Sequence, residues 1–154
     1  MKMEVWAVGK LKHRELESSL NQYLKRVRRY QTIGTEDIIV KTRSTDPAIL
    51  RKAEGERILA RLAGSDFLIL LDEKGDRLTS VEFARFIQKS MMNPVNRIVF
   101  LIGGAYGFDK TVYDRSQALI SLSVLTFPHD LARLIAVEQL YRAFCILHNS
   151  PYHH

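Results

Sequence analysis

The sequence predicts an α/β fold in which a mostly parallel sheet of five or six strands is covered by helices on both faces. Strand-like and helix-like segments alternate along the whole chain, which is typical of parallel strands joined by crossover helices. The central strand-like segments are apolar throughout, so both of their faces should be buried. With 154 residues and no linker, low-complexity segment or internal repeat, we expect a single domain spanning residues 1–154.

The first half of the chain is predicted to supply two strands and two helices. Met1–Val8 has the composition of a strand, and Arg14–Arg29 carries apolar residues at helical spacing. A second short strand is expected at Asp37–Lys41. The next helix should begin after Asp46, which can cap it, with Pro47 at its first position.

Two apolar strands and a capped helix are expected in the middle of the chain. Asp66–Leu71 should form a strand that ends in the turn Asp72–Asp76, and Arg97–Ile102 should form another. Between them, Thr79 can cap a helix, and Glu82 lies three residues on, where it completes a capping box.

The C-terminal part is predicted to add a short helix at Thr111–Gln117, a fifth strand at Ala118–Leu122 and a long helix from His129 to about His148. Apolar residues surround nearly the whole circumference of that last helix, so it should be buried on more than one side. The sheet can cover one side in a chain of this size. We therefore expect a homodimer formed through this helix, with Leu140 and Phe144 as representative interface positions.

The positive charge of the chain is concentrated in its first part. The formal net charge is +6; residues 1–61 hold 14 Lys and Arg against 8 Asp and Glu, whereas residues 62–154 hold 9 of each. Such asymmetry favours a polyanion-binding protein, although many basic proteins are simply well solvated. The single cysteine, Cys145, excludes an intrachain disulfide and indicates core packing in a reduced, cytoplasmic setting. No apolar run has the length of a membrane span, and the N-terminus lacks a signal-peptide pattern.

Common nucleotide and metal motifs are missing. The chain has no G-x-G-x-x-G after its first strand, no P-loop, no C-x-x-C and no H-E-x-x-H, and its histidines lack metal-ligand spacing. Three loops stand out instead, each after an apolar strand: Leu71-Asp72-Glu73, Gly103-Gly104 and Leu122–Phe127. Ligands of open α/β sheets bind at these strand ends. A glycine pair alone favours a tight turn, but three converging loops favour a ligand site, with His129, Asp130 and Arg133 at its side.

Five segments carry a family resemblance: Val5–Lys10, Phe100–Gly104, Ser121–His129, Glu138–Phe144 and Pro151–His153. They resemble the RlmH family of SPOUT methyltransferases, and the resemblance spans the whole chain. It implies S-adenosylmethionine as methyl donor, a homodimer and a trefoil knot in the C-terminal half. It also implies a substrate, N3 of a pseudouridine in the inter-subunit stem-loop (helix 69) of 23S ribosomal RNA. The hydrophobic pattern gives no sign of a knot, so that expectation rests on the resemblance alone.

The resemblance also assigns cofactor-binding positions, which are Leu71, Gly103, Gly104, Leu122, Ser123, Val124, Leu125, Thr126 and Phe127. These residue types suit the task. Glycine allows a close backbone approach, and apolar side chains can form walls for a flat adenine ring. A sulfonium cation is poorly served by a strongly basic pocket, so uncharged loops make chemical sense.

Four residues are candidates for the chemistry, namely His129, Arg142, Tyr152 and His153. Methylation at N3 requires loss of the N3 proton, which a nearby base would assist. His129 could equally cap or pack, and Arg142 could simply pair with Glu138 four residues earlier. Tyr152 and His153 lie at a chain end, where an aromatic ring could stack on an RNA base. The sequence does not identify which of these side chains accepts the N3 proton.

The RNA backbone is expected to contact Lys10, Lys12, Lys25, Arg26, Arg28, Arg29 and Arg133. Lys25–Arg29 also lies at a helix C-terminus, where the helix dipole favours cations whatever the function. The family usually ends with Lys or Arg after its Tyr-His pair, whereas this chain has His154, so one positive charge is missing there. Two other readings stay open: a non-catalytic ribosome-associated RNA-binding protein of the same fold, and a flavodoxin-like nucleotide binder. The sequence does not decide between the free subunit and the assembled ribosome as substrate.

Overall fold

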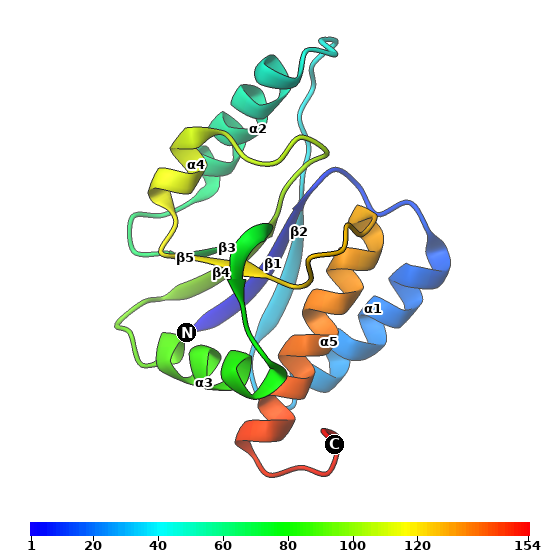
Figure 1. Cartoon of the computed structure of the whole chain (residues 1–154), viewed down its shortest axis with the longest axis vertical. Coiled ribbons are helices and arrows are strands. Elements are labelled where there is room, and N and C mark those ends of the chain that lie inside the picture. The colour runs from blue at the N-terminus through cyan, green and yellow to red at the C-terminus, as the bar shows by residue number, and fades with distance from the viewer.

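The computed structural model describes all 154 residues and contains one sheet of five parallel strands (Figure 1). The strands are β1 (Lys2–Val8), β2 (Ile33–Ile38), β3 (Phe67–Arg77), β4 (Arg97–Ile102) and β5 (Ala118–Ser121). Their order is β2-β1-β4-β3-β5, and every neighbouring pair is parallel. The predicted α/β fold is confirmed, with five strands.

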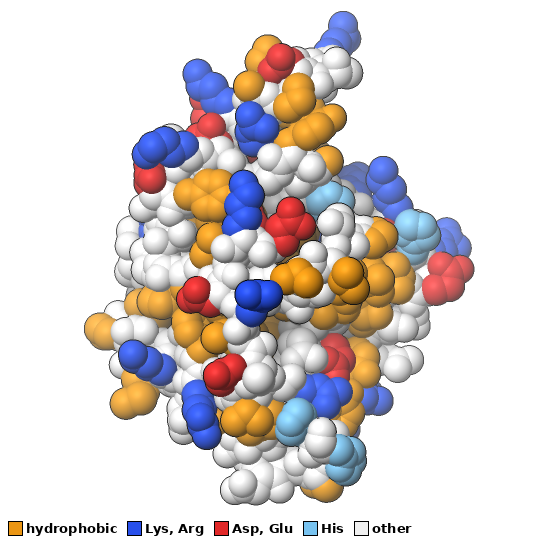
Figure 2. Space-filling view, in the orientation of Figure 1, with side chains coloured by type: hydrophobic (Ala, Val, Ile, Leu, Met, Phe, Trp, Pro, Cys, Tyr) orange, Lys and Arg blue, Asp and Glu red, His pale blue; other side chains and the backbone are white.

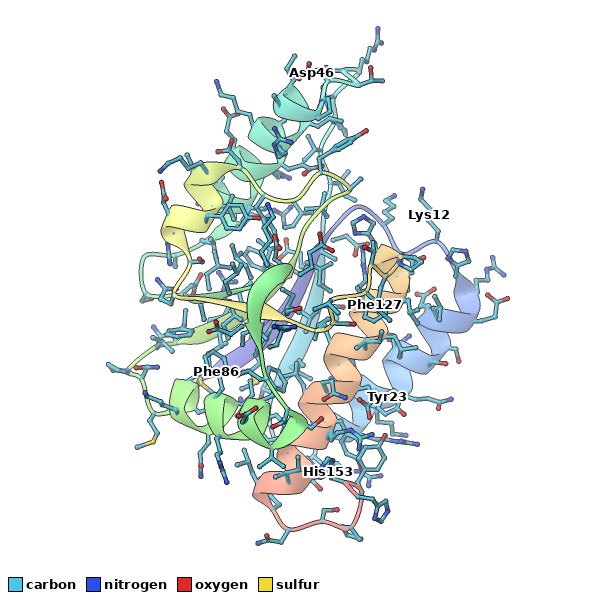
Figure 3. The ribbon with its side chains drawn as sticks, viewed as in Figure 1. Lys12, Tyr23, Asp46, Phe86, Phe127 and His153 are labelled. Carbon is cyan, nitrogen blue, oxygen red and sulfur yellow. The ribbon has the colours of Figure 1, made fainter.

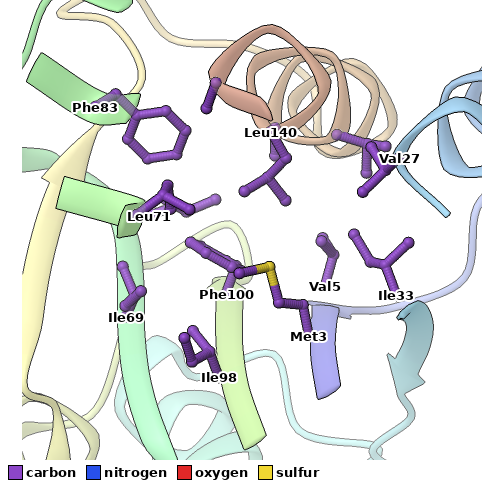
Figure 4. Packing of buried hydrophobic residues seen from close by; sticks show 14 of the residues in the cluster. Met3, Val5, Val27, Ile33, Ile69, Leu71, Phe83, Ile98, Phe100 and Leu140 are labelled. Carbon is purple, nitrogen blue, oxygen red and sulfur yellow. The ribbon is translucent and has the colours of Figure 1, made fainter. Parts of the chain in front are cut away.

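Helices cover both faces of the sheet, as predicted. One face carries α1 (Arg14–Val27), α3 (Ser80–Met91) and α5 (His129–Leu147), and the other carries α2 (Pro47–Arg61) and α4 (Lys110–Arg115) (Figure 1). Alternate residues of each strand therefore enter different cores. Met3 and Val5 of β1 pack with α1, α3 and α5 (Figure 4), whereas Trp6 of the same strand packs with α2 and α4.

The two predicted helix caps are present. The Asp46 carboxylate accepts hydrogen bonds from the N–H groups of Ala48 (2.9 Å) and Ile49 (3.0 Å) at the start of α2. At the start of α3, the Thr79 hydroxyl accepts from the Glu82 N–H (3.2 Å), and the Glu82 carboxylate accepts from the Thr79 N–H (2.7 Å). Both helix starts therefore follow directly from local sequence.

The second strand lies earlier than predicted. Met3 of β1 pairs with Ile33, and Val8 pairs with Ile38, so β2 is Ile33–Ile38 rather than Asp37–Lys41. This edge strand buries only its two terminal isoleucines fully. The residues between them are mostly polar, so the sequence lacks the apolar pattern that would predict a strand here. Because β1 ends at Val8, the chain beyond Ile38 has no strand to pair with.

The predicted turn at Asp72–Asp76 is wrong, because β3 continues to Arg77. Leu71 and Asp76 both lie opposite Ile120 of β5, so the residues between them form a bulge in the strand. Gly75 makes the close approach possible. A Cβ atom added there would lie 2.5 Å from the Ile120 nitrogen and 2.6 Å from the Leu119 carbonyl carbon.

The last helix, α5, is the central element of one core. Its inner residues Val137, Leu140 and Phe144 are buried against the sheet, whereas Leu131 and Ile135 are half-buried and belong to neither core. In Figure 1 the end of β3 crosses in front of β5. That crossing is consistent with the predicted knot. None of the helices has the length and apolar character of a membrane span.

Candidate active site

A cavity of about 580 Å³ lies at the carboxyl edge of the sheet. The β3 bulge, which contains most of the predicted loop Leu71-Asp72-Glu73, and the loops after β4 and β5 converge on it, together with the N-terminus of α5. Its lining includes Leu71, Ile102, Gly103, Gly104, Phe108, Leu122, Ser123, Leu125, Thr126, Phe127 and Ala132. Its volume lies within the range of small-molecule sites, roughly 300–1,000 Å³.

The residues predicted to hold the cofactor are brought together at this cavity. All of them line it except Val124, whose side chain is 61% exposed. Figure 3 shows Phe127 at the N-terminal end of α5, between the sheet and the helix. The sequence therefore located the cavity, although it did not give the direction of each side chain in the loop.

The loop Leu122–Phe127 offers uncommitted backbone groups to the cavity. The Ser121 hydroxyl donates to the Ser123 carbonyl (2.9 Å), and the Leu125 N–H donates to the Ser123 hydroxyl (3.0 Å). The other amides and carbonyls of the loop have no partner within the chain. Such groups can bind the polar edge of a flat heterocycle without a charged side chain.

Two glycines after β4 let side chains pack tightly against the loop. A Cβ added at Gly103 would lie 3.0 Å from the Phe108 ring, and one added at Gly104 would lie 2.8 Å from the Glu54 carboxylate of α2. That carboxylate has no hydrogen-bond or ion-pair partner, and burial raises the pKa of Glu54. The glycines thus set how closely α2 and Phe108 approach the cavity.

Several lining residues were not found from the sequence. Arg51 comes from α2, Lys74 from the bulge in β3, and Tyr106 from the turn after β4, where it is 50% exposed. Tyr113 of α4 also lines the cavity and donates to Asp72 (2.5 Å). Burial and this hydrogen bond raise the pKa of Tyr113 to about 12. These residues lie far from the three loops in sequence or carry no local pattern that marks them.

The predicted cluster at the start of α5 divides in the structure. His129 lines the cavity. Asp130 is buried and accepts hydrogen bonds from the N–H groups of Lys12 (2.9 Å) and His13 (3.2 Å) and pairs with the His13 ring. Burial by itself would raise the pKa of Asp130, but these partners hold it below its ordinary value. Asp130 therefore fixes the loop between β1 and α1.

Arg133 has a structural environment that does not fit a phosphate contact. It is 5% exposed, pairs with Asp37 near the end of β2 and donates to the Gly9 carbonyl after β1. Its two terminal nitrogens thereby tie two strand ends together, and its Nε atom is buried without a hydrogen-bond partner. Among the predicted RNA contacts, Arg133 is thus set apart by its burial.

The other predicted cations lie in two places. Lys10 and Lys12 are exposed in the loop after β1, beside the N-terminus of α5. Lys25, Arg28 and Arg29 are exposed at the far end of α1. Nearby, the Arg26 guanidinium lies 5.0 Å from the centre of the Tyr23 ring, and Arg28 donates to the Ile33 carbonyl (3.3 Å). The cations therefore do not form one continuous strip.

The C-terminal tail packs at the opposite end of α5 from the cavity, as the positions of Phe127 and His153 show (Figure 3). Glu138 accepts from Arg142 (2.7 Å) and from the Tyr152 hydroxyl (3.1 Å), and Arg142 lies 3.3 Å from the His153 ring nitrogen. Burial and hydrogen bonds to Tyr23 and Glu138 raise the pKa of Tyr152. Within one chain, Arg142, Tyr152 and His153 form a cluster away from the cavity.

The chain matches known proteins over its full length. Residues 1–153 match a family model described as predicted SPOUT methyltransferase. The chain is 43% identical over 156 residues to a protein named ribosomal RNA large subunit methyltransferase H from Christiangramia forsetii, covering 100% of this chain and 99% of that protein. The protein of the same name from Cytophaga hutchinsonii is 43% identical, with 100% of both chains covered.

A likeness to a solved structure concerns the fold alone. A crystal structure of a probable rRNA-methyltransferase from Porphyromonas gingivalis has a TM-score of 0.50 and 13% sequence identity. The match covers 92% of this chain and 68% of that chain. It supports the arrangement of the sheet and helices described above.

Proposed function

Because this chain belongs to the SPOUT methyltransferase family, in the group named ribosomal RNA large subunit methyltransferase H, we propose that it methylates N3 of a pseudouridine in helix 69 of 23S ribosomal RNA. The chain is a ribosomal RNA methyltransferase. The target position and the methyl donor, S-adenosylmethionine, are what we propose in addition. The observation that carries the proposal is the cavity where the β3 bulge and the loops after β4 and β5 meet.

The cavity fits S-adenosylmethionine by its chemistry. The free amides and carbonyls of Leu122–Phe127 can bond to the adenine edge, and Leu71 and Leu125 can cover its faces. When bound, the cofactor supplies a methyl group on a sulfonium centre. The residues of the chain hold the cofactor and the base in line, and alignment of this kind lowers a barrier by up to roughly 7–11 kcal/mol in well-oriented systems.

His129 is the predicted catalytic residue that lines the cavity within the same chain. Its imidazole is a candidate acceptor for the N3 proton, a role that contributes about 10²–10⁴-fold. Asp130, next in sequence, holds the first turn of α5 against the loop before α1. These hydrogen bonds fix the backbone at His129.

A homodimer would bring the remaining catalytic candidates to the cavity. The half-buried Leu131 and Ile135 leave an apolar strip on α5 without a partner, which a second copy can cover. Neither Tyr152 nor His153 lines the cavity of its own chain; Tyr152 bonds to Glu138, and His153 lies at the other end of α5 from Phe127 (Figure 3). We therefore assign them, with Arg142, to the substrate bound in the partner's cavity.

RNA contacts are proposed for the exposed cations Lys10, Lys12, Lys25 and Arg29, with Arg26 and Arg28 beside them. They would bind phosphates and give the affinity a strong salt dependence. Arg133 is left out, because its guanidinium is buried and both of its terminal nitrogens already have partners within the chain.

Methylation of ribosomes from a strain that lacks this modification tests the proposal. The wild-type protein with S-adenosylmethionine should add one methyl group to a pseudouridine of helix 69, located by mass mapping of nuclease fragments. Separate reactions with free large subunits and with assembled ribosomes identify the substrate form. Calorimetry with S-adenosylmethionine addresses the non-catalytic alternative: an absence of cofactor binding would favour a binding protein, and a methyl group elsewhere would overturn the assigned target.

A further inference from the structure

One basic surface of the molecule is not used by the proposed function. It consists of residues 39–52, which we call the arm: the segment after β2 and the beginning of α2. The arm projects beyond the sheet at the top of Figure 1, and Asp46 marks its tip in Figure 3. Residues 39–46 have no regular secondary structure and pair with no strand.

The charge of the arm is positive and unpaired. Its four cations are Lys41, Arg43, Arg51 and Lys52. None of them makes an ion pair or a side-chain hydrogen bond within the chain, and Lys41, Arg43 and Lys52 are exposed. The only acidic residue of the arm, Asp46, already accepts two backbone N–H groups as the cap of α2. Cations left free in this way are available to an external anion.

Hydroxyl groups alternate with these cations. The Thr42 hydroxyl accepts a hydrogen bond from the Ser44 N–H (3.2 Å), and the Ser44 hydroxyl accepts one from the Asp46 N–H (3.2 Å). Because both oxygens act as acceptors, their own protons remain free to be donated. Lysine, arginine, serine and threonine side chains are the common donors to nucleic-acid phosphates.

Arg51 connects the arm to the cavity. It lies on α2 and lines the cavity, on which the β3 bulge residue Lys74 also converges. Lys10 and Lys12 lie in the loop after β1, on the side of α5 rather than of α2. A nucleotide entering the cavity would therefore have the arm on the α2 side and these two lysines on the α5 side.

We propose that the arm binds the phosphodiester backbone of the RNA substrate next to the target nucleotide, with Arg51 as the phosphate contact nearest the cavity. The inference rests on the proposed function for the identity of the substrate as RNA. Phosphate contacts supply affinity and fix the register of the protein on the RNA, whereas base selection belongs to the cavity.

The test compares variants of equal charge change. Lys41→Gln/Arg43→Gln removes two cations of the arm, and Arg51→Gln removes the one at the cavity. Arg85→Gln/Lys89→Gln on α3 is the matched control, since both residues are exposed and neither makes an ion pair or side-chain hydrogen bond. Dissociation constants for deproteinised 23S ribosomal RNA and for ribosomes are measured across a salt series.

The arm variant should bind both probes about tenfold more weakly, and the slope of log K against log salt should fall by about 1.4–1.8 for two lost contacts. Arg51→Gln should lower the slope by about half as much. The control should keep the wild-type slope, and Lys41→Arg/Arg43→Lys should bind as the wild type does. For methyl transfer, the arm variant should raise KM and leave kcat nearly unchanged.

Equal slopes for the arm variant and the α3 control would overturn the proposal while leaving the methyltransferase function intact. Weaker binding to ribosomes without weaker binding to deproteinised RNA would also overturn it, because the arm would then contact a ribosomal protein. A wild type that binds neither probe would overturn the proposed function and the arm together.

Discussion

At the scale of single residues, Gly103 controls the space between the cavity and Phe108. A Cβ at this position would lie 3.0 Å from the ring, which is buried and packs edge-on against Tyr113 with ring centres 5.6 Å apart. We expect Gly103→Val to displace the loop and to weaken S-adenosylmethionine binding at least tenfold, about 1.4 kcal/mol. Calorimetry on the folded variant measures the change.

Gly64→Val provides the control for that prediction, because nothing lies within 4 Å of a Cβ added at Gly64. It should bind the cofactor normally. A folded Gly103→Val variant with wild-type affinity would mean that the cofactor binds outside the cavity.

The lining residues divide into those that the sequence predicts and those that it does not. Gly103 and Phe127 are predictable because parallel strands end at one edge and their loops must meet there, and Leu71 lies at the same edge, opposite the last residue of β4. Arg51 is not, because it reaches the cavity only through the packing of α2 on α4. At that contact Gly55 lies so close that an added Cβ would be 3.1 Å from the Asp109 Cβ. No local pattern in α2 reveals such an approach.

At the scale of elements, an ion pair fastens the start of β4 to the residue before β3. Arg97 donates to both carboxylate oxygens of Asp66 (3.1 and 2.5 Å) and to Glu4 (3.2 Å). Burial by itself would raise the pKa of Asp66, but Arg97 and the Ala63 N–H lower it below its ordinary value. A lowered pKa stabilises the fold above the pKa of the unfolded carboxyl, about 3.9, and this stabilisation is lost as the pH falls through the folded pKa.

Asp66→Asn should therefore lose about 3 kcal/mol at neutral pH, because Arg97 keeps its charge without a full partner. Its stability should also fall less steeply than that of the wild type below about pH 4. Urea unfolding between pH 3 and 7 measures both effects. Parallel stability curves for the two proteins would show that the pair does not contribute to the pH dependence.

The crossing of β3 and β5 depends on Gly75. Its added Cβ would meet backbone atoms of Leu119 and Ile120 within 2.6 Å, and backbone cannot rotate away as a side chain can. Gly75→Ala should destabilise the protein by about 2–3 kcal/mol or more, since overpacking here must separate two strands. Thermal unfolding measures the loss, and Gly64→Ala serves as the unhindered control. An unchanged melting temperature would mean that the crossing is loosely packed.

The helices that begin at a capping residue were predictable from the sequence. The bounds of strands that depend on pairing with a neighbouring strand were not. Asp46 and Thr79 start their helices through hydrogen bonds to neighbouring residues, which the sequence displays. β2 and the extension of β3 depend on the strand beside them. The register of β1 decides where Ile33–Ile38 pairs, and β5 turns an expected loop at Asp72–Asp76 into a bulge.

At the scale of the molecule, the proposed dimer depends on the outer strip of α5. The apolar pattern alone suggested Leu140 and Phe144, but each is only 1% exposed in the core of its own chain. Their replacement by Asp would unfold the monomer. Ile135 is the better probe because it is half-buried and belongs to neither core.

Ile135→Asp should give a folded monomer without methyltransferase activity, since a charge in a dimer contact is costly to bury. Met92→Asp, at an 82% exposed position, should remain dimeric and active. Sedimentation velocity and circular dichroism check both variants. A monomeric and active wild type would overturn the dimer.

The separation of the tail from the cavity leads to a test of shared sites. A chain truncated after Pro151 loses Tyr152 and its packing on Tyr141 (ring centres 4.7 Å apart), but it keeps the whole cavity lining. It should bind S-adenosylmethionine normally and transfer methyl groups at least tenfold more slowly, because substrate contacts at the reacting base are lost. Some loss of stability is expected from the exposed Tyr141 ring.

Mixing the truncated chain with Gly103→Val after co-refolding, at a cofactor concentration too low to load the Gly103→Val cavity, should give more activity than either variant has alone. Random pairing makes half of the dimers mixed, and each mixed dimer has one site with an intact cavity and an intact tail from the other protomer. The mixture should therefore reach about a quarter of wild-type activity. If the tail served the cavity of its own chain, every site in the mixture would lack one component, and the mixture would be no more active than the separate variants. The two arrangements thus differ in a single measured rate, without any need to know which group accepts the N3 proton.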